Sequence, residues 1–209
     1  MEVIVYNSKG EDTGRKVELS DAIFGIEPNT HAIYLDVKQH LANRRQGTHK
    51  TKERAENAHS TRKIKKQKGT GGARAGSLKS PTIIGGGTIF GPRPRDYSFK
   101  LNKKVKQLAR RSALAVKAQD NSVAVLEGFT LEAPRTKDYV AFLNALRVSD
   151  KKTLLILPDV DTNVVKSSRN IQKARVATAS QVNTYDLMNA EQLLISVDAL
   201  DKLQTLLAN

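Results

Sequence analysis

The chain contains no cysteine in its 209 residues, and this absence excludes disulfide frameworks and thiolate metal sites. The composition is compatible with a cytosolic location. Long apolar runs are also missing, because the longest aliphatic run, at 154–157, is far too short to span a bilayer. Residues 1–6 carry neither a basic leader nor a signal-length apolar run, and we expect them to form a strand. The sequence therefore predicts no membrane partner.

Cofactor-binding motifs are scarce as well. No Walker loop is present, and the pattern G-x-G-x-x-G beginning at Gly69 fails because Arg74 stands at the third glycine position. The four histidines are isolated and lack the spacing of zinc ligands. We expect no cofactor, no metal and no enzymatic activity.

Two acids leave one catalytic alternative open. Asp159 and Asp161 follow a buried apolar segment, at the position where α/β enzymes place catalytic groups, so an enzyme acting on nucleic acid is conceivable. No nucleophile or set of metal ligands accompanies them. A strand-to-helix turn with Asp161 near the helix N-terminus is the preferred interpretation.

Positive charge is concentrated in one segment. Residues 43–104 contain 17 Lys and Arg against three acids, which accounts for the whole net charge of +14. The other 147 residues are balanced, with 18 bases and 18 acids. A neutral body that carries a glycine-rich cationic loop is typical of a protein that binds a folded polyanion, so nucleic acid is the expected partner.

The same segment is poor in core-forming residues. Between 58 and 79, only Ile64 and Leu78 are apolar and larger than alanine. Such a segment cannot bury enough apolar surface to offset an ordering cost of roughly 1–2 kcal/mol per residue. We expect it to be disordered alone and ordered on a partner.

The remaining residues predict an α/β fold. The predicted strands are at 2–6, 16–19, 122–127, 153–157, 175–179 and 193–197. The predicted helices are at 30–44, 102–119, 136–148, 162–168 and 184–187, followed by a last helix capped by Asp198. Strands that alternate with helices indicate a three-layer domain built on a parallel sheet. We expect a discontinuous globular domain, 1–43 and 101–209, into which an extended basic loop, 44–100, is inserted.

The predicted helix at 102–119 has one core-facing side and one basic side. The core-facing residues are Val105, Leu108, Ser112, Ala115 and Val116. The opposite face carries Lys103, Lys106, Arg110 and Lys117, with Lys104 and Arg111 on its flank. This stripe continues the charge of the loop, so contact with phosphates is favoured over a merely solvated face.

The loop also carries aromatic residues near its end. Phe90, Tyr97 and Phe99 have rings that stack on unpaired bases in RNA-binding proteins. For Phe90 and Phe99, seating the base of the loop on the domain is the slightly favoured interpretation. Arg93 and Arg95 lie between prolines in an extended chain, and we expect them to contact phosphates.

Several ordered motifs together resemble a known family. They are Gln46-Gly47-Thr48, Lys52-Glu53-Arg54-Ala55-Glu56, Gln67-Lys68-Gly69-Thr70-Gly71, Gly85-Gly86-Gly87 and Phe90-Gly91-Pro92-Arg93-Pro94-Arg95-Asp96-Tyr97-Ser98. This series resembles the bacterial L4 family of large-subunit ribosomal proteins over essentially the whole chain. Where many members have Lys-Pro-Trp before Gln67, this chain lacks the Pro-Trp, and Gly72 stands where a basic residue is common. The tip of the loop is therefore expected to differ in shape.

The resemblance implies a cytoplasmic protein of the large ribosomal subunit. Its α/β domain would lie on the subunit surface, and its loop would thread through ribosomal RNA to the wall of the polypeptide exit tunnel. The implied partners are the 5′ region of the large-subunit RNA, neighbouring ribosomal proteins and, near the loop tip, the nascent peptide. A regulatory RNA-binding protein outside the ribosome, for example one that represses its own operon mRNA, is the alternative.

The predicted RNA-binding residues are Arg44, Arg45, Lys50, Lys52, Arg54, Arg62, Lys63, Lys65, Lys66, Lys68, Arg74, Lys79, Arg93, Arg95, Lys100, Lys103, Lys104, Lys106 and Arg110. The predicted tunnel-proximal tip consists of Lys63, Gln67, Lys68, Gly69, Thr70, Gly71, Gly72 and Arg74.

Overall fold

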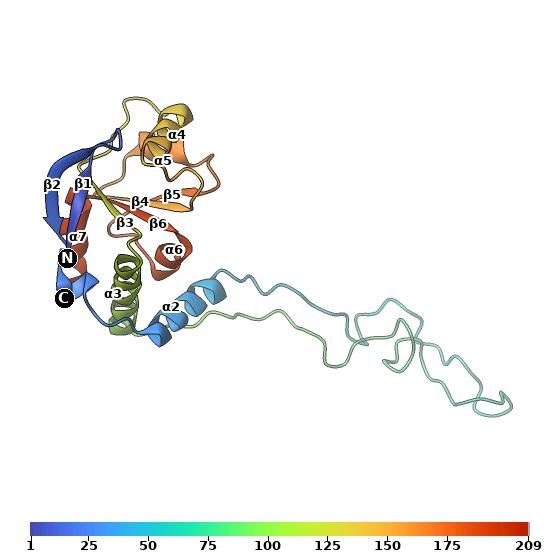
Figure 1. Ribbon diagram of the computed structural model, residues 1–209. Coiled ribbons are helices and arrows are strands. Elements are labelled where there is room, and N and C mark those ends of the chain that lie inside the picture. Colours follow the sequence, from blue (N-terminus) through green and yellow to red (C-terminus); the bar gives the residue numbers. More distant parts are fainter. Residues whose placement is uncertain (209) are drawn as a thin grey trace. The chain divides into compact units, whose positions relative to one another are not determined.

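The computed structural model describes residues 1–208, in which six strands form one mixed sheet (Figure 1). The strand order is β2-β1-β3-β6-β4-β5, and only the β1–β2 pair is antiparallel. The strands are β1 (Glu2–Tyr6), β2 (Asp12–Glu18), β3 (Val123–Leu126), β4 (Thr153–Leu157), β5 (Ala174–Thr178) and β6 (Gln192–Ser196). The helices are α1 (Asp21–Phe24), α2 (Thr30–Asn43), α3 (Lys103–Gln119), α4 (Thr136–Ala145), α5 (Thr162–Ser168), α6 (Thr184–Asn189) and α7 (Val197–Ala208). The α/β class predicted from the sequence is confirmed.

Strand β4 shows why the domain has three layers. All five of its residues are buried, as expected for a strand with helices on both faces of the sheet. Successive side chains of a strand point to opposite faces. Leu154 and Ile156 accordingly join one hydrophobic cluster, and Leu155 and Leu157 join the other. The sheet therefore separates two cores.

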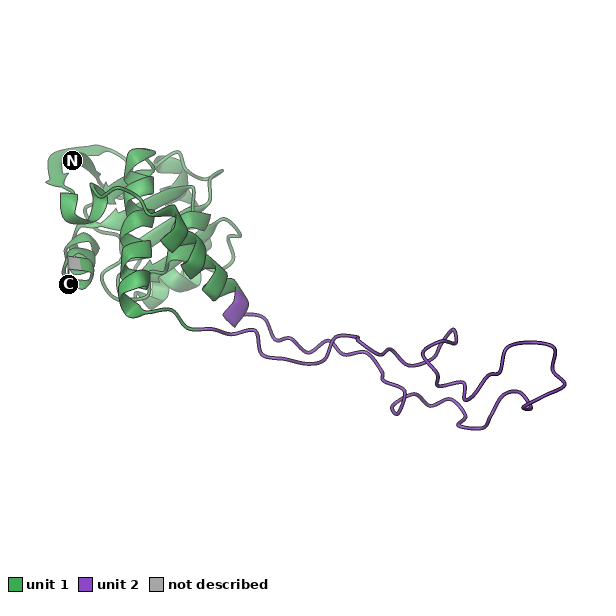
Figure 2. Ribbon diagram, turned by 90° about the horizontal axis from the view of Figure 1, so that it is seen from below, with its two compact units in different colours: residues 1–41, 100–209 green, residues 42–99 purple. Residues whose placement is uncertain are grey.

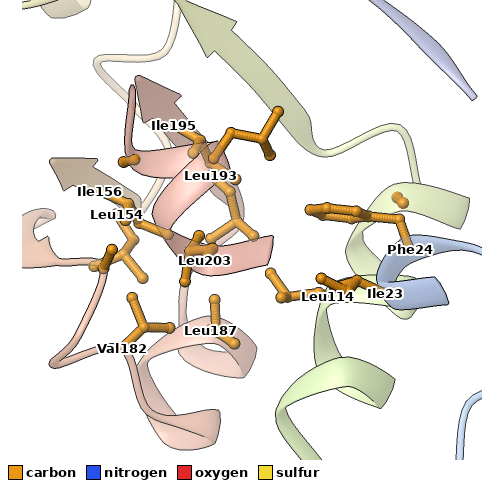
Figure 3. Close-up of a cluster of buried hydrophobic side chains, with 14 of the residues drawn as sticks. Ile23, Phe24, Leu114, Leu154, Ile156, Val182, Leu187, Leu193, Ile195 and Leu203 are labelled. Carbon is orange, nitrogen blue, oxygen red and sulfur yellow. The ribbon is translucent and has the colours of Figure 1, made fainter. Parts of the chain in front are cut away.

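The larger core lies on the face covered by α1, α3, α6 and α7 (Figure 3). Leu193 and Ile195 of β6 point into it, where they face Leu203 of α7 and Leu187 of α6. Leu114 of α3 is completely buried in the same cluster. Full burial of a leucine side chain contributes about 1.5–3 kcal/mol, so this core gives the domain stability of its own.

The smaller core lies on the other face, beneath α4 and α5. Three aromatic rings make up much of it, with Phe129 stacked on Phe142 at a centroid distance of 4.0 Å and Tyr139 edge-on to both. The Tyr139 hydroxyl is buried without a hydrogen-bond partner among the described residues. Burial also raises the pKa of this hydroxyl well above its usual value.

The structure corrects several details of the sequence-based prediction. Strand β2 begins at Asp12 rather than at residue 16, and the four-residue helix α1 was not predicted. Asp198 does not cap the last helix, because α7 already begins at Val197 and the backbone N–H of Ala199 donates to Ser196 Oγ at 3.3 Å. Helix α4 ends at Ala145 because Arg147 adopts a left-handed backbone conformation with φ of 57°.

Helices α2 and α3 also differ from their predicted patterns. Leu41 of α2 is 49% exposed, and Leu108 of α3, predicted to face the core, is 40% exposed. Lys117 was assigned to the basic face, but it is buried because the C-terminal half of α3 is covered on nearly all sides. The predicted basic stripe is therefore confined to the N-terminal half of α3.

The chain divides into two compact units, coloured separately in Figure 2. Residues 1–41 and 100–209 form the α/β unit, and residues 42–99 form the second unit, which we call the basic loop. Beyond the end of α2, the basic loop contains no helix or strand within the described residues. None of the described helices is long and apolar enough to cross a membrane.

Candidate nucleic-acid interface

The basic loop closes on itself through bonds between its outgoing and returning segments. The backbone N–H of Arg95 donates to the Gly47 carbonyl at 3.2 Å, and the N–H of Thr51 donates to the Pro92 carbonyl at 3.1 Å. Further along, the N–H of Thr88 donates to the Lys52 carbonyl at 3.0 Å. These bonds join the two segments over the half of the loop that begins at α2.

The same pairing continues toward the far end of the loop. The Asn57 amide donates to the Gly85 carbonyl at 3.0 Å, and Ser77 Oγ donates to the Ser60 carbonyl at 2.9 Å. The last cross-loop bond runs from the N–H of Ile64 to the Gly76 carbonyl at 3.0 Å. The chain therefore reverses between 64 and 76, which overlaps the tip expected from the sequence.

Glycines allow the two segments to approach closely. A Cβ on Gly87 would overlap the backbone nitrogen of Arg54 on the opposite segment. A Cβ on Gly91 would overlap the side chain of Thr51 in the same way. Gly86 lies against the Ser80 carbonyl within a tight turn of the returning segment. Since glycine alone lacks a Cβ, these positions depend on it for the observed packing.

The acids of the loop are occupied by neighbouring groups near its α2 end. Glu56 pairs with Lys50, and Glu53 pairs with Arg93. The hydrogen bond from Lys50 lowers the pKa of Glu56 below its usual value. Asp96 accepts hydrogen bonds from the hydroxyl and backbone N–H of Ser98, and these lower the pKa of its carboxyl group.

Beyond these pairs, the loop is purely cationic. Residues 57–95 contain no Asp or Glu, and they carry nine Lys and Arg residues. Only Arg93 among these nine has a carboxylate partner within the part of the chain that the structure describes. Uncompensated positive charge therefore increases from the α2 end of the loop toward its tip, which is the arrangement expected for a polyanion-binding element.

Tyr97 forms a small cluster near the α2 end of the loop. The guanidinium groups of Arg45 and Arg95 lie over its ring, 3.9 and 4.4 Å from the centroid, and its hydroxyl bonds to His49 Nε2 at 3.2 Å. Hydrogen bonding by Arg95, followed by the positive charges of Arg45 and Arg95, lowers the pKa of the Tyr97 hydroxyl. Tyr97 therefore organises two predicted RNA-binding arginines within the loop.

The two phenylalanines of the loop differ. Phe90 is 99% exposed, so the expectation that it seats the base of the loop on the domain is wrong for this residue. Phe99 is half-buried, and its backbone N–H donates to Asn43 Oδ1 at 3.2 Å. The exposed ring of Phe90 is available for stacking on a base.

The structure leaves the predicted RNA-binding residues accessible. None is buried, and all are exposed except Lys79, Lys106 and Arg110, which are half-buried. Those up to Arg95 belong to the basic loop, and those from Lys100 onward belong to the α/β unit. The sequence reasoning did not find the cross-loop bonds or the close approaches at Gly87 and Gly91, although the glycine-rich composition was a signal for close backbone packing.

The acids of the catalytic alternative have structural roles. Asp161 is the N-cap of α5 and accepts from the backbone N–H groups of Asn163 at 2.9 Å and Val164 at 3.4 Å, as the strand-to-helix interpretation predicted. Asp159 pairs with Lys202 at 2.7 Å. Within the described residues, no group of three or more His, Cys, Asp or Glu side chains is arranged to hold a metal ion.

Comparison with known proteins places these features in context. The model of the ribosomal protein L4/L1 family matches residues 17–206. The chain is 61% identical over 207 residues to the large ribosomal subunit protein uL4 of Cytophaga hutchinsonii, covering 99% of this chain and 100% of the relative. It is 59% identical over 208 residues to the uL4 protein of Phocaeicola vulgatus, covering 100% of both chains. It is also 63% identical over 203 residues to that of Amoebophilus asiaticus, covering 97% of both.

Proposed function

The chain belongs to the ribosomal protein L4/L1 family, and we propose that its basic loop binds large-subunit ribosomal RNA. The resemblance inferred from the sequence motifs is confirmed by this membership. The protein is a structural, non-enzymatic constituent of the large ribosomal subunit. In this role, the α/β unit provides a stable body and the loop provides the polyanion-binding surface.

The observation that carries the proposal is the segment 57–95, which contains no acid and lies in a loop whose outgoing and returning segments are joined by hydrogen bonds. Each cation that meets a phosphate releases condensed counterions from the RNA, and this release supplies sequence-independent affinity. The bonds from Gly47 to Arg95 and from Ile64 to Gly76 fix the course of both segments. The segment 58–79 is expected to be disordered alone, and the cross-loop bonds offset part of the entropy cost of ordering it on RNA.

The proposal extends to the position of the loop in the subunit. The family resemblance supports binding to the 5′ region of the large-subunit RNA, with the tip near Lys68 and Gly71 at the wall of the exit tunnel. There the tip would meet the nascent peptide, and the rest of the chain would meet neighbouring ribosomal proteins. The reversal of the chain between 64 and 76 supports this assignment of the tip.

A salt-titrated binding assay on the 5′ domain of large-subunit RNA, with transfer RNA as competitor, tests the proposal. If about ten loop cations meet phosphates, log affinity should fall with log salt with a slope of about −7 to −9. Binding that survives the competitor near physiological salt supports specific recognition. Equal binding to both RNAs, disappearing as salt rises, would contradict it.

A variant in which a short linker replaces 44–100 is the matched control. Its two hydrophobic cores contain no residue of the deleted segment, so it should fold and bind RNA weakly.

Co-sedimentation separates the proposal from the regulatory alternative. A subunit constituent stays with the large particle through a high-salt wash, whereas a regulator acting outside the ribosome is removed.

A further inference from the structure

A hollow of about 540 Å³ opens at the far end of the basic loop. We call it the tip hollow, and its lining residues are Ser60, Arg62, Lys63, Ile64, Lys65, Lys66 and Leu78. Its volume falls within the range of about 300–1,000 Å³ that is typical of sites for small organic groups. All of its residues belong to one unit of the chain, so the hollow is a feature of the loop itself.

Two apolar side chains are the unusual part of this lining. Ile64 and Leu78 are the only large apolar residues between 58 and 79, and both line the tip hollow. They remain 43% and 40% exposed, so their contacts within the loop leave much of their surface open to solvent. Phosphate binding does not use such surface, whereas the face of a nucleobase is apolar enough to pack against it.

Hydrogen bonds hold the backbone near both apolar residues of the hollow. The N–H of Ile64 itself donates to the Gly76 carbonyl at 3.0 Å. Next to Leu78, the buried Ser77 hydroxyl donates to the Ser60 carbonyl at 2.9 Å and accepts from the N–H of Lys79 at 3.1 Å. Hydrogen bonds therefore join the segment that carries Ile64 to the segment that carries Leu78.

The charged residues of the lining all carry the same sign. Arg62, Lys63, Lys65 and Lys66 line the hollow, and no carboxylate within the described part of the chain pairs with any of them. Lys63 donates to the side-chain oxygen of Gln67, an uncharged partner, at 2.5 Å. A lining that combines two apolar side chains with four cations complements a nucleotide, whose base is largely apolar on its faces and whose phosphate is anionic.

We propose that the tip hollow receives one extruded nucleotide of an unpaired RNA segment. The base lies against Ile64 and Leu78, and the adjacent phosphates are held by Arg62, Lys65 and Lys66. The inference rests on the proposed binding of the loop to ribosomal RNA and adds a defined subsite to it. A base inside a continuous double helix is stacked on both faces and cannot enter, so the site selects single-stranded or bulged RNA.

The experiment compares the full-length protein with an Ile64→Ser/Leu78→Ser double variant on the 5′ domain transcript. Base-specific chemical probing identifies the protected nucleotides, and a salt titration measures affinity. The double variant should lose protection at one unpaired base and bind roughly tenfold more weakly, which is the effect of removing one base contact. Its salt slope should stay unchanged, because every cation is retained.

Two control variants make the result specific. Ile84→Ser removes an isoleucine that is fully exposed outside the hollow, and it should leave both protection and affinity unchanged within twofold. Ile64→Leu keeps an apolar side chain in the lining, so the same base should stay protected from chemical probing. Circular dichroism of each variant confirms that the α/β unit remains folded.

The possible outcomes separate the two proposals. Failure of the unmodified protein to bind the transcript specifically would overturn the proposed RNA binding. Normal binding with an unchanged protection pattern in the double variant would overturn the nucleotide subsite alone, including the case in which the apolar pair contacts a protein or peptide instead. Loss of protection across the whole footprint would also overturn it, since that result indicates a rearranged loop.

Discussion

Neutralising the four cations of the tip hollow should reduce the salt dependence of RNA binding by a defined amount. The variant carries Arg62→Gln, Lys63→Gln, Lys65→Gln and Lys66→Gln. Since these side chains have no carboxylate partner among the described residues, the change removes four charges without freeing any acid. If each meets a phosphate, the slope of log affinity against log salt should become less negative by about 3.

The same reasoning gives the loss of affinity. At 0.15 M salt, the counterion-release contribution of four contacts corresponds to roughly two to three powers of ten in the binding constant. Fluorescence anisotropy on the 5′ domain transcript, from about 50 to 400 mM salt, measures the slope and the affinity in one titration. The stability of the α/β unit should not change, because no substituted residue belongs to it.

A charge-matched control uses four exposed lysines of the α/β unit that form no ion pair within the described residues. They are Lys9, Lys137, Lys151 and Lys166, each replaced by Gln. This control lowers the net charge by the same amount but should leave the slope within about 1 of the original value. An equal change in both variants would show that net charge alone governs binding, and would refute the assignment of contacts to the tip.

Three further predictions concern other parts of the molecule. Gly86→Ala places a Cβ against a backbone carbonyl and should weaken RNA binding, whereas Gly76→Ala meets nothing within 4 Å and should be neutral in the same assay; equal affinities would contradict the packing argument. Tyr139→Phe removes a buried hydroxyl without a partner and should raise the free energy of unfolding by about 1 kcal/mol in urea titration; a loss of stability would show that the hydroxyl is satisfied. Lys50 lowers the pKa of Glu56, so this pair should stabilise loop closure above the usual carboxyl pKa and lose its effect as pH falls through the lower value. Carboxyl NMR should show the pKa of Glu56 rising toward its usual value in Lys50→Gln, and an unshifted Glu56 in the original protein would contradict the pairing.

The α/β unit was largely predictable because its signals are local. The fully buried strand β4 has the bounds expected from the sequence, and Asp161 caps α5 as its position before a helical segment indicated. The last helix shows the limit of such signals. Both Ser196 and Asp198 are good capping residues, and only the end of β6 determines that the helix begins at Val197.

Burial was less predictable where tertiary packing overrides periodicity. Lys117 lies on the basic side of α3 by helical spacing, but the other helices of its face cover the C-terminal half of α3 and bury it. The long aliphatic stem of lysine tolerates such a position. Helix α1 was missed because four residues do not establish a period.

The sequence predicts the charge of the basic loop but not the pairing of its two segments. The absence of acids from 57–95 is visible in the sequence and indicates the partner. The bonds that join Gly47 to Arg95 and Ile64 to Gly76 link irregular segments, which carry no periodic signal of pairing. Ile64 and Leu78 line the same hollow because those bonds bring their segments together. This arrangement could not be predicted from the sequence alone.

Lysine labelling in large ribosomal subunits tests whether the basic loop is embedded in RNA. Salt-washed particles and the free protein are treated with an amine-reactive reagent, and the modified lysines are identified by mass spectrometry. If the loop is embedded in RNA, Lys63, Lys65, Lys66 and Lys68 should be labelled in the free protein and protected in the particle. Equal labelling of these lysines in both states, or loss of the protein from the washed particle, would contradict the account.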